Sequence, residues 1–272
     1  MTLLEAIILG IVQGLTEFLP ISSSGHLRII PAFAGWEDPG ALFTAVIQLG
    51  TMAAVIIYFW RDLLGIVRTW LASLRHPELR QELDARMGWY LIIATIPIGI
   101  VGLAFKDQIE NGARNLYLIG TFLIAAGIVL AVADRMGRKV RDLDAVGRMD
   151  AVWIGIAQAF ALIPGTSRSG ATITAGLFLG LKREAAARFS FLLSIPAVVL
   201  SGLFGLTELA NGNGSVSYGD LAVATIFAFI FGYLSIAFLL RYLANHSMMI
   251  FVVYRLVLGV VVIALVATGT IS

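Results

Sequence analysis

The sequence predicts an all-α integral membrane protein with six transmembrane helices and two re-entrant broken-helix regions in an inverted-topology repeat. Three observations predict this fold. First, 59% of the 272 residues are hydrophobic, only 13% are charged, and the mean hydropathy is +0.91, whereas a soluble domain has to present more charge to water. Second, six apolar segments are long enough to cross a bilayer. Third, two further apolar segments resemble each other and are interrupted by proline and polar residues.

The composition excludes some classes of site. The chain has no cysteine, so it can form neither a disulfide framework nor a thiolate metal site. Its three histidines, His26, His76 and His246, lie too far apart in sequence for a local metal motif. The formal net charge of +2 says little, because the arrangement of charge along a membrane chain matters more than its sum. We expect membrane lipids, and not nucleic acid, as partners.

A helix needs ~20 mostly apolar residues to cross ~30 Å of hydrocarbon. The six segments that qualify are 41–60, 87–105, 115–133, 186–206, 219–240 and 248–268. Regions 3–34 and 151–181 are apolar but broken in the middle, so each is expected to form two half-helices. Because unpaired backbone is costly in lipid, such breaks must be buried in protein or line a wet cavity.

Basic residues predict the orientation of the spans. They cluster at 61–86, 135–148 and 182–188, and basic clusters mark cytoplasmic loops. If all three clusters are cytoplasmic, the six spans alternate consistently, and the loops at 106–114 and 207–218 lie outside. The first broken region then enters the membrane from the outer face and the second enters from the cytoplasm.

The two broken regions are therefore inverted copies, an architecture that places a site near the membrane midplane between discontinuous helices. We expect one membrane domain over 1–272. Repeat one covers about 1–133, a cytoplasmic linker covers 134–150, and repeat two covers about 151–272.

The breaks carry a shared motif, GIVQGLTEFLPISSSG at 10–25 and GIAQAFALIPGTSRSG at 155–170. Each copy has a glycine, a glutamine three residues later, a proline, and a serine three residues beyond that proline. These residues are Gly10, Gln13, Pro20 and Ser23 in the first copy, and Gly155, Gln158, Pro164 and Ser167 in the second. The first copy adds Glu17 and His26, whereas the second adds Arg168. Together they supply the chemistry of one site.

In the first copy, Gln13 and Glu17 share one face of a helix. Ser23, His26 and Glu17 have the chemistry of a nucleophile, a base and an orienting group. Two structural alternatives remain open for Glu17, an ion pair with Arg168 or a partly wet carboxylate. For His26 the alternative is a satisfied interior histidine.

In the second copy, a helix beginning after the break would present free N–H groups and a positive dipole end, which bind anions. The serines and threonines there can equally be helix caps. Arg168 favours the anion site, because its planar fork suits phosphate or carboxylate oxygens, although it can also form a structural ion pair with Glu17. Arg255 lies inside an apolar span, and we expect it to pair with backbone carbonyls or with a dimer partner.

These residues resemble the undecaprenyl-diphosphate phosphatases of the bacitracin-resistance (BacA) type over the whole chain. The Glu/Gln-x-x-x-Glu motif of that family resembles Gln13 to Glu17, and some members have Glu where this chain has Gln13. The family's serine and histidine loop fits Ser22, Ser23 and His26. Its Pro-Gly-x-Ser-Arg-Ser-x-x-Thr motif is matched by Pro164, Gly165, Ser167, Arg168, Ser169 and Thr172.

The resemblance implies hydrolysis of undecaprenyl diphosphate to undecaprenyl phosphate and inorganic phosphate, in the bacterial inner membrane, at a site open to the periplasm or outer face. This reaction recycles the lipid carrier for peptidoglycan synthesis and gives bacitracin resistance. The family uses a divalent cation, Mg²⁺ or Ca²⁺, for which Glu17 and Gln13 are the candidate ligands here. The implied catalytic residues are Glu17, Ser23, His26 and Arg168. The candidate diphosphate-binding residues are Ser22, Gly165, Thr166, Ser167, Ser169, Gly170 and Thr172.

Several mechanisms fit these residues. Ser23 is the candidate nucleophile, with His26 as base or as acid toward the leaving group, and with Glu17 orienting His26 or binding the metal. A phosphohistidine at His26, or direct attack by water, are the alternatives. A secondary transporter or a lipid-carrier flippase also fits an inverted repeat, and a homodimer remains open.

Overall fold

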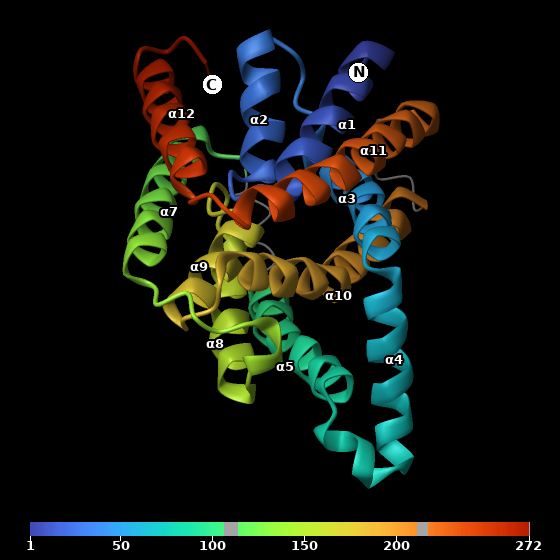
Figure 1. The fold of residues 1–272 in the computed structure, drawn as a ribbon. Coiled ribbons are helices and arrows are strands. Elements are labelled where there is room, and N and C mark those ends of the chain that lie inside the picture. The colour runs from blue at the N-terminus through green and yellow to red at the C-terminus, as the bar shows by residue number, and fades with distance from the viewer. Residues whose placement is uncertain (106–113, 211–216, 272) are drawn as a thin grey trace.

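The computed structural model describes residues 1–105, 114–210 and 217–271, and this part of the chain is helical (Figure 1). The long helices are α1 (Leu3–Phe18), α2 (Ser23–Ala34), α3 (Gly40–Tyr58), α4 (Trp60–Arg75), α5 (Leu83–Ala104), α7 (Leu116–Met136), α8 (Arg148–Ala159), α9 (Arg168–Phe178), α10 (Arg183–Ala210), α11 (Tyr218–Leu243) and α12 (Met249–Ala267). Three short 3₁₀ helices are η1 (Pro77–Gln81), η2 (Leu143–Ala145) and η3 (Phe160–Leu162).

Five helices of the described chain are long and apolar enough to cross a membrane, namely α3, α5, α7, α11 and α12. They confirm five of the six predicted spans. The sixth predicted range, 186–206, lies within α10, which does not meet the same criterion over its described residues. A count of six spans therefore stays a prediction. Most of the two connections predicted to be outside, 106–114 and 207–218, falls outside the described residues.

Both regions predicted to be broken do form two α-helices each, and the second also contains a short 3₁₀ helix. Region 3–34 divides into α1 and α2, and region 151–181 into α8, η3 and α9. Pro20 lies in the first interruption and Pro164 in the second, where proline removes a backbone donor and disfavours helix in the preceding residue. Figure 1 shows α1 and α2 in the upper half and α8 and α9 in the lower half, with the two interruptions between them.

The basic segment 61–86 was predicted to be cytoplasmic, and the structure adds that the 16-residue helix α4 covers its first part. Its apolar residues recur at helical spacing between the arginines, so the charges that marked the segment as cytoplasmic lie on one face of an amphipathic helix. The helix packs against α5, where an added Cβ at Gly88 would lie 2.7 Å from Trp70. Basic residues alone therefore did not define a loop here.

Each first half-helix packs against a span from the other half of the chain. Helix α1 lies on α11 and helix α8 lies on α5. The motif glycines allow these approaches: a Cβ on Gly10 would lie 2.3 Å from the carbonyl oxygen of Ala224, and one on Gly155 would lie 2.7 Å from that of Ala94. Gly10 and Gly155 thus serve backbone contact between helices.

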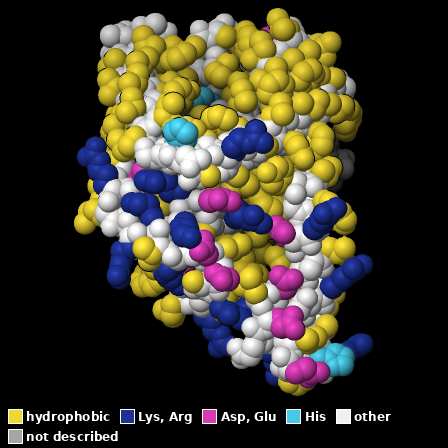
Figure 2. Space-filling model, viewed as in Figure 1, with side chains coloured by type: hydrophobic (Ala, Val, Ile, Leu, Met, Phe, Trp, Pro, Cys, Tyr) yellow, Lys and Arg dark blue, Asp and Glu magenta, His cyan; other side chains and the backbone are white. Residues whose placement is uncertain are grey.

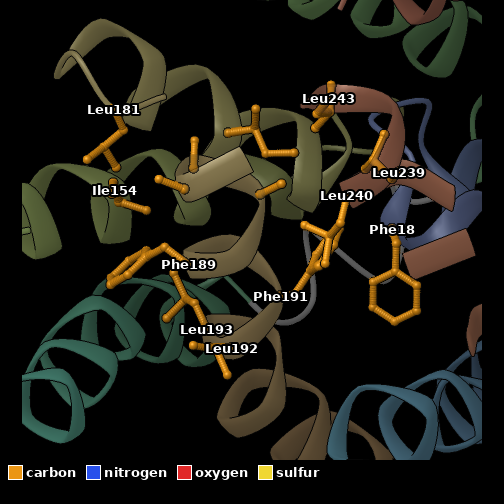
Figure 3. Close-up of a cluster of buried hydrophobic side chains, with 14 of the residues drawn as sticks. Phe18, Ile154, Leu181, Phe189, Phe191, Leu192, Leu193, Leu239, Leu240 and Leu243 are labelled. Atoms are coloured by element: carbon orange, nitrogen blue, oxygen red, sulfur yellow. The ribbon is translucent and has the colours of Figure 1, made fainter. Parts of the chain in front are cut away.

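Helix α10 runs through the middle of the largest hydrophobic cluster. Phe191 of α10 packs edge-on against Phe18 of α1, with ring centroids 5.2 Å apart, whereas Phe189 lies on the side of Ile154 of α8 in Figure 3. In Figure 2 the charged side chains gather over the lower half of the molecule and hydrophobic side chains cover the upper half. The two interruptions lie between these zones in the same view.

Candidate active site

The two interruptions meet in the interior of the molecule. The Ser169 hydroxyl donates to the backbone oxygen of Leu19 at 3.1 Å, which joins the start of α9 to the end of α1. An ion pair between Glu17 and Arg168 links the same two helices. Residues that are 151 positions apart therefore share one site, as predicted from the repeated motif.

Glu17 is the centre of this site, and its side chain is only 5% exposed. Its Oε1 accepts a hydrogen bond from the Arg168 guanidinium. Its Oε2 accepts from the Ser23 hydroxyl at 2.6 Å and from the Gln13 amide at 2.9 Å. The carboxylate thus joins a cation, a hydroxyl and an amide, and the ion pair left open by the sequence is present.

Ser23 and Arg168 occupy equivalent places in the two breaks, since each is the first residue of its half-helix. The residues before them, Ser22 and Ser167, have φ angles of 74° and 72°, a region that residues other than glycine rarely adopt. Each of these two hydroxyls accepts the N–H of a glycine three residues later and caps its helix. Ser22, and not Ser23, is therefore the equivalent of Ser167, so the predicted pairing of Ser23 with Ser167 is wrong by one residue. That pairing was counted from the prolines, and Pro164 lies one residue earlier in its copy than Pro20 does in the first.

His26 lies in the same break but does not bond to Ser23. Its Nδ1 is 2.7 Å from the backbone oxygen of Ser22, and its Nε2 is 2.7 Å from the Tyr254 hydroxyl. A carbonyl oxygen only accepts, so Nδ1 carries the proton, and in the neutral ring Nε2 accepts from Tyr254. The expected pairing of His26 with Ser23 is not formed, and Glu17 bonds to Ser23 directly instead of orienting His26.

The other hydroxyls of the second motif serve mainly the local backbone. Thr172 donates toward the backbone oxygen of Arg168 at 2.9 Å and lies 2.6 Å from the Ser190 hydroxyl. Thr166 differs, because its buried hydroxyl has no hydrogen-bond partner within the described chain. Among the predicted diphosphate-binding hydroxyls, that of Thr166 is therefore available to a ligand, whereas those of Ser22 and Ser167 cap helices.

The two glycines predicted to bind diphosphate allow close approach. Gly165 has a φ of +90°, and a Cβ there would lie 2.4 Å from the backbone oxygen of Ile119. A Cβ on Gly170 would lie 2.8 Å from the Arg255 guanidinium. A side chain would clash at either position, so these two glycines let the second break approach α7 and α12 closely.

Arg255 holds the two breaks together from α12 and is fully buried. Its guanidinium donates to five backbone oxygens at 2.9–3.2 Å, from Pro20, Phe122, Leu123, Gly165 and Thr166. The expected pairing of Arg255 with backbone carbonyls is confirmed. Three of these oxygens follow the C-terminal ends of α1 and η3, where the helix dipole favours a cation.

An apolar cavity of about 530 Å³ adjoins the second break. It is lined by Pro97, Val101, Phe105, Leu118, Ile156, Ala159, Phe160, Leu162, Ile163 and Pro164. These residues come from α5, α7, α8 and η3 and from the segment that leads into the break.

Residues 6–261 match the family model described as bacitracin resistance protein BacA. The chain belongs to this family. Its similarity to individual members extends over nearly the full length of both proteins. It is 54% identical to an undecaprenyl-diphosphatase of Nocardioides over 269 residues, which are 99% of this chain and 98% of the relative. It is 55% identical to one from Mycolicibacterium smegmatis over 275 residues, covering 100% and 99%. For one from Thermobifida fusca the identity is 52%, covering 100% and 93%.

The BacA motifs thus converge on Glu17, but sequence analysis missed Tyr254 as the partner of His26 and Ser190 as the partner of Thr172. The one signal for Tyr254 was its position beside Arg255, a charged residue within an apolar span. Partners 228 positions apart leave no trace in local spacing.

Proposed function

We propose that this BacA-family protein hydrolyses undecaprenyl diphosphate to undecaprenyl phosphate and inorganic phosphate. One observation carries the proposal: the carboxylate of Glu17 binds the Ser23 hydroxyl and the Arg168 guanidinium at once. Phosphoryl transfer needs charge neutralisation, an aligned nucleophile and a group that takes a proton. The cluster supplies all three in a site shielded from bulk water.

The diphosphate binds between the N-termini of α2 and α9. Both half-helices begin at the breaks, at Ser23 and Arg168, and the first N–H groups of a helix have no partner within it. Two positive dipole ends and one guanidinium therefore face the same place. Only one terminal nitrogen of Arg168 bonds to Glu17, so its other N–H groups can bind phosphate oxygens.

Ser23 is the nucleophile in this proposal. Its hydroxyl attacks the terminal phosphorus, its proton passes to Glu17 over the 2.6 Å hydrogen bond, and undecaprenyl phosphate leaves as the P–O bond of the anhydride breaks. Water then hydrolyses the phosphoserine and releases inorganic phosphate. The engagement of both ring nitrogens of His26 supports Ser23 over a phosphohistidine.

A divalent cation fits the site moderately well. The described residues hold no cluster of three or more acidic, histidine or cysteine ligands, but Mg²⁺ is commonly bound by one or two carboxylates together with substrate phosphates. Glu17 offers a carboxylate, and the buried Oε1 of Gln13 has no hydrogen-bond partner within the described chain. Glu17 and Gln13 would hold the ion, which would neutralise charge on the diphosphate.

Gln13→Glu tests this assignment by adding a second carboxylate beside Glu17. We expect the cation concentration that gives half-maximal phosphate release to fall several-fold, because a hard cation gains an anionic ligand. Titration of Mg²⁺ and Ca²⁺ after chelation with EDTA measures the change. An unchanged titration would place the ion elsewhere, and chelation without effect would remove it from the proposal.

The proposal places the protein in the bacterial inner membrane with the site toward the periplasm or outer face. The five apolar helices support a multi-pass membrane protein, and the basic segments near α4 and the 134–150 linker support a cytoplasmic lower half. In that orientation the α1–α2 break opens outward. Hydrolysis there would recycle the lipid carrier for peptidoglycan synthesis and give bacitracin resistance.

Phosphate release from undecaprenyl diphosphate by the purified protein in detergent tests the proposed activity. The enzyme needs no membrane gradient, so release in detergent is the expected result. No release, together with gradient-driven uptake into vesicles, would instead support a transporter or flippase.

Acid quenching of the wild-type reaction tests the nucleophile and should trap phosphate on Ser23. The Ser23→Ala variant should form no trapped species. Full turnover by Ser23→Ala would overturn the serine mechanism.

Tyr254→Phe should lower kcat about 10²-fold, the lower end of the range for one proton-transfer group, with little change in KM. The substitution keeps the stacked ring, whose centroid is 5.6 Å from that of His26, and removes only the hydroxyl. The measurement is kcat and KM across pH, where the shape of the profile should change. Tyr233→Phe on α11 is the matched control, because the ring of Tyr233 packs against Tyr58 and its hydroxyl is not the partner of His26. Equal kinetics for both variants would make Tyr254 a packing residue.

A further inference from the structure

A second cavity, of about 460 Å³, shares no lining residue with the Glu17 cluster. Its walls come from the end of α3 and the start of α4, from the first turns of α10, and from the last turns of α11. In the proposed orientation these helix ends face the cytoplasm. The cavity then lies where the hydrocarbon of the inner leaflet meets its headgroups.

The cavity is lined by two carboxylates and two guanidinium groups, from Asp62, Glu184, Arg188 and Arg241. One pair is formed among them, since a terminal nitrogen of Arg188 lies 2.8 Å from Asp62. Neither Glu184 nor Arg241 forms an ion pair or a side-chain hydrogen bond with the described residues. The charged part of the lining is therefore neutral as a whole, yet it offers one unpaired group of each sign.

Arg188 is fixed in place and still has donors to offer. Its guanidinium carbon lies 5.6 Å from the centroid of the Phe59 ring, in a cation–π contact. Only one of its terminal nitrogens bonds to Asp62, and its Nε has no hydrogen-bond partner within the described chain. A guanidinium with unused N–H groups binds phosphate oxygens well.

The inner wall of the cavity is apolar and belongs to the core. Phe59 is only 3% exposed, and its ring centroid lies 6.5 Å from that of Phe191, which in turn packs on Phe18 at 5.2 Å. Tyr58 and Leu240 extend this wall, whereas Glu184 and Arg241 are exposed to the surface. An apolar wall with a few charged groups at one end suits a ligand that has both parts.

A ligand that carries a phosphate and an ammonium together would pair every charged group of the lining. The phosphate accepts from the two arginines, and the ammonium donates to the two carboxylates. An anionic headgroup without the ammonium would face both carboxylates as like charges, and a choline headgroup has no N–H to donate. Phosphatidylethanolamine has the phosphate, the ammonium and the hydrocarbon that the cavity requires.

We propose that the cavity between α3, α10 and α11 binds phosphatidylethanolamine of the cytoplasmic leaflet. The phosphate lies at Arg188 and Arg241, the ammonium lies at Glu184, and the glyceride part rests on Phe59 and Leu240. The bound lipid holds the ends of the three helices together and stabilises the folded protein by mass action. This site requires a membrane location but not the hydrolysis of a diphosphate.

Thermal unfolding of the full-length protein in detergent, with lipid added as mixed micelles, tests the site. Phosphatidylethanolamine should raise the unfolding temperature by roughly 5 °C at a hundredfold excess over its half-saturating concentration. Phosphatidylcholine and phosphatidylglycerol should raise it far less. Glu184→Gln and Arg241→Gln should each increase the half-saturating concentration of phosphatidylethanolamine about tenfold, since each removes one charge-assisted contact. Without lipid, both variants should unfold like wild type.

Arg135→Gln is the matched control. Arg135 is an exposed arginine in the last turn of α7, as Arg241 is in α11, but it does not line the cavity. Equal stabilisation by all three lipids, or equal lipid titrations of Arg241→Gln and Arg135→Gln, would overturn the site. Stronger stabilisation by phosphatidylglycerol would overturn the choice of a zwitterionic ligand. Because unfolding is measured, a failure of the proposed hydrolysis leaves this test unaffected.

Discussion

Arg168→Ala is expected to reduce phosphate release from undecaprenyl diphosphate by about 10³-fold or more, the range found for arginines that stabilise phosphoryl transfer. Two effects add in this variant. The diphosphate loses its guanidinium, and Glu17 loses the cation that neutralises its nearly buried carboxylate. The measurement is kcat/KM in detergent with purified protein.

Arg168→Lys separates charge from geometry. Lysine keeps the positive charge but cannot bind Glu17 and phosphate with one planar fork, so we expect activity at least tenfold below wild type yet above that of Arg168→Ala. Arg61→Ala, at an exposed position at the start of α4, removes an arginine without touching the site. Wild-type rates in Arg168→Ala would show that the ion pair with Glu17 is purely structural.

Arg255→Met should destabilise the whole protein as well as inactivate it. The guanidinium satisfies five backbone oxygens in the interior, and each buried acceptor left unpaired costs on the order of 1–3 kcal/mol before relaxation. We expect the free energy of unfolding to fall by about 3–5 kcal/mol, as when one partner of a buried polar network is removed. Denaturation in detergent, followed by circular dichroism, measures the loss.

Arg241→Met is the control for this effect, since Arg241 is exposed near the end of α11. Arg255→Lys should restore little of the stability and activity lost in Arg255→Met, because an ammonium cannot reach carbonyls from α7 and both breaks together. A folded Arg255→Met protein with wild-type stability and turnover would show that the breaks hold their positions without this residue.

The sequence was sufficient to predict the features that depend on neighbouring residues. Hydropathy located α3, α5, α7, α11 and α12, because each span is a continuous apolar run. Proline and polar clusters located both breaks, because these signals also lie in residues that are neighbours in the sequence. The repeated motif also indicated that Glu17 and Arg168 share a site, since the acid and the cation occurred in copies of one pattern.

Features that depend on distant residues could not be predicted. The hydroxyl of Tyr254 reaches His26 from α12, which changed the expected role of the imidazole. The equivalence of Ser22 with Ser167 became clear only from their shared φ angles, because the two prolines are offset by one position. Helix α4 was not predicted from the basic cluster at 61–86, since charge patterning reports the side of the membrane and not the backbone conformation.

The crossed packing of the two halves has a consequence for synthesis. Helix α1 leaves the ribosome before α11, yet the surface it packs against belongs to that helix, and the clamp on both breaks arrives only with α12. Helix α1 must therefore wait in the bilayer for a partner that is translated about two hundred residues later. A nascent chain cannot hold Glu17 and Arg168 together as a working pair before α12 has been inserted, so copies that lack an inserted α12 are expected to be catalytically silent.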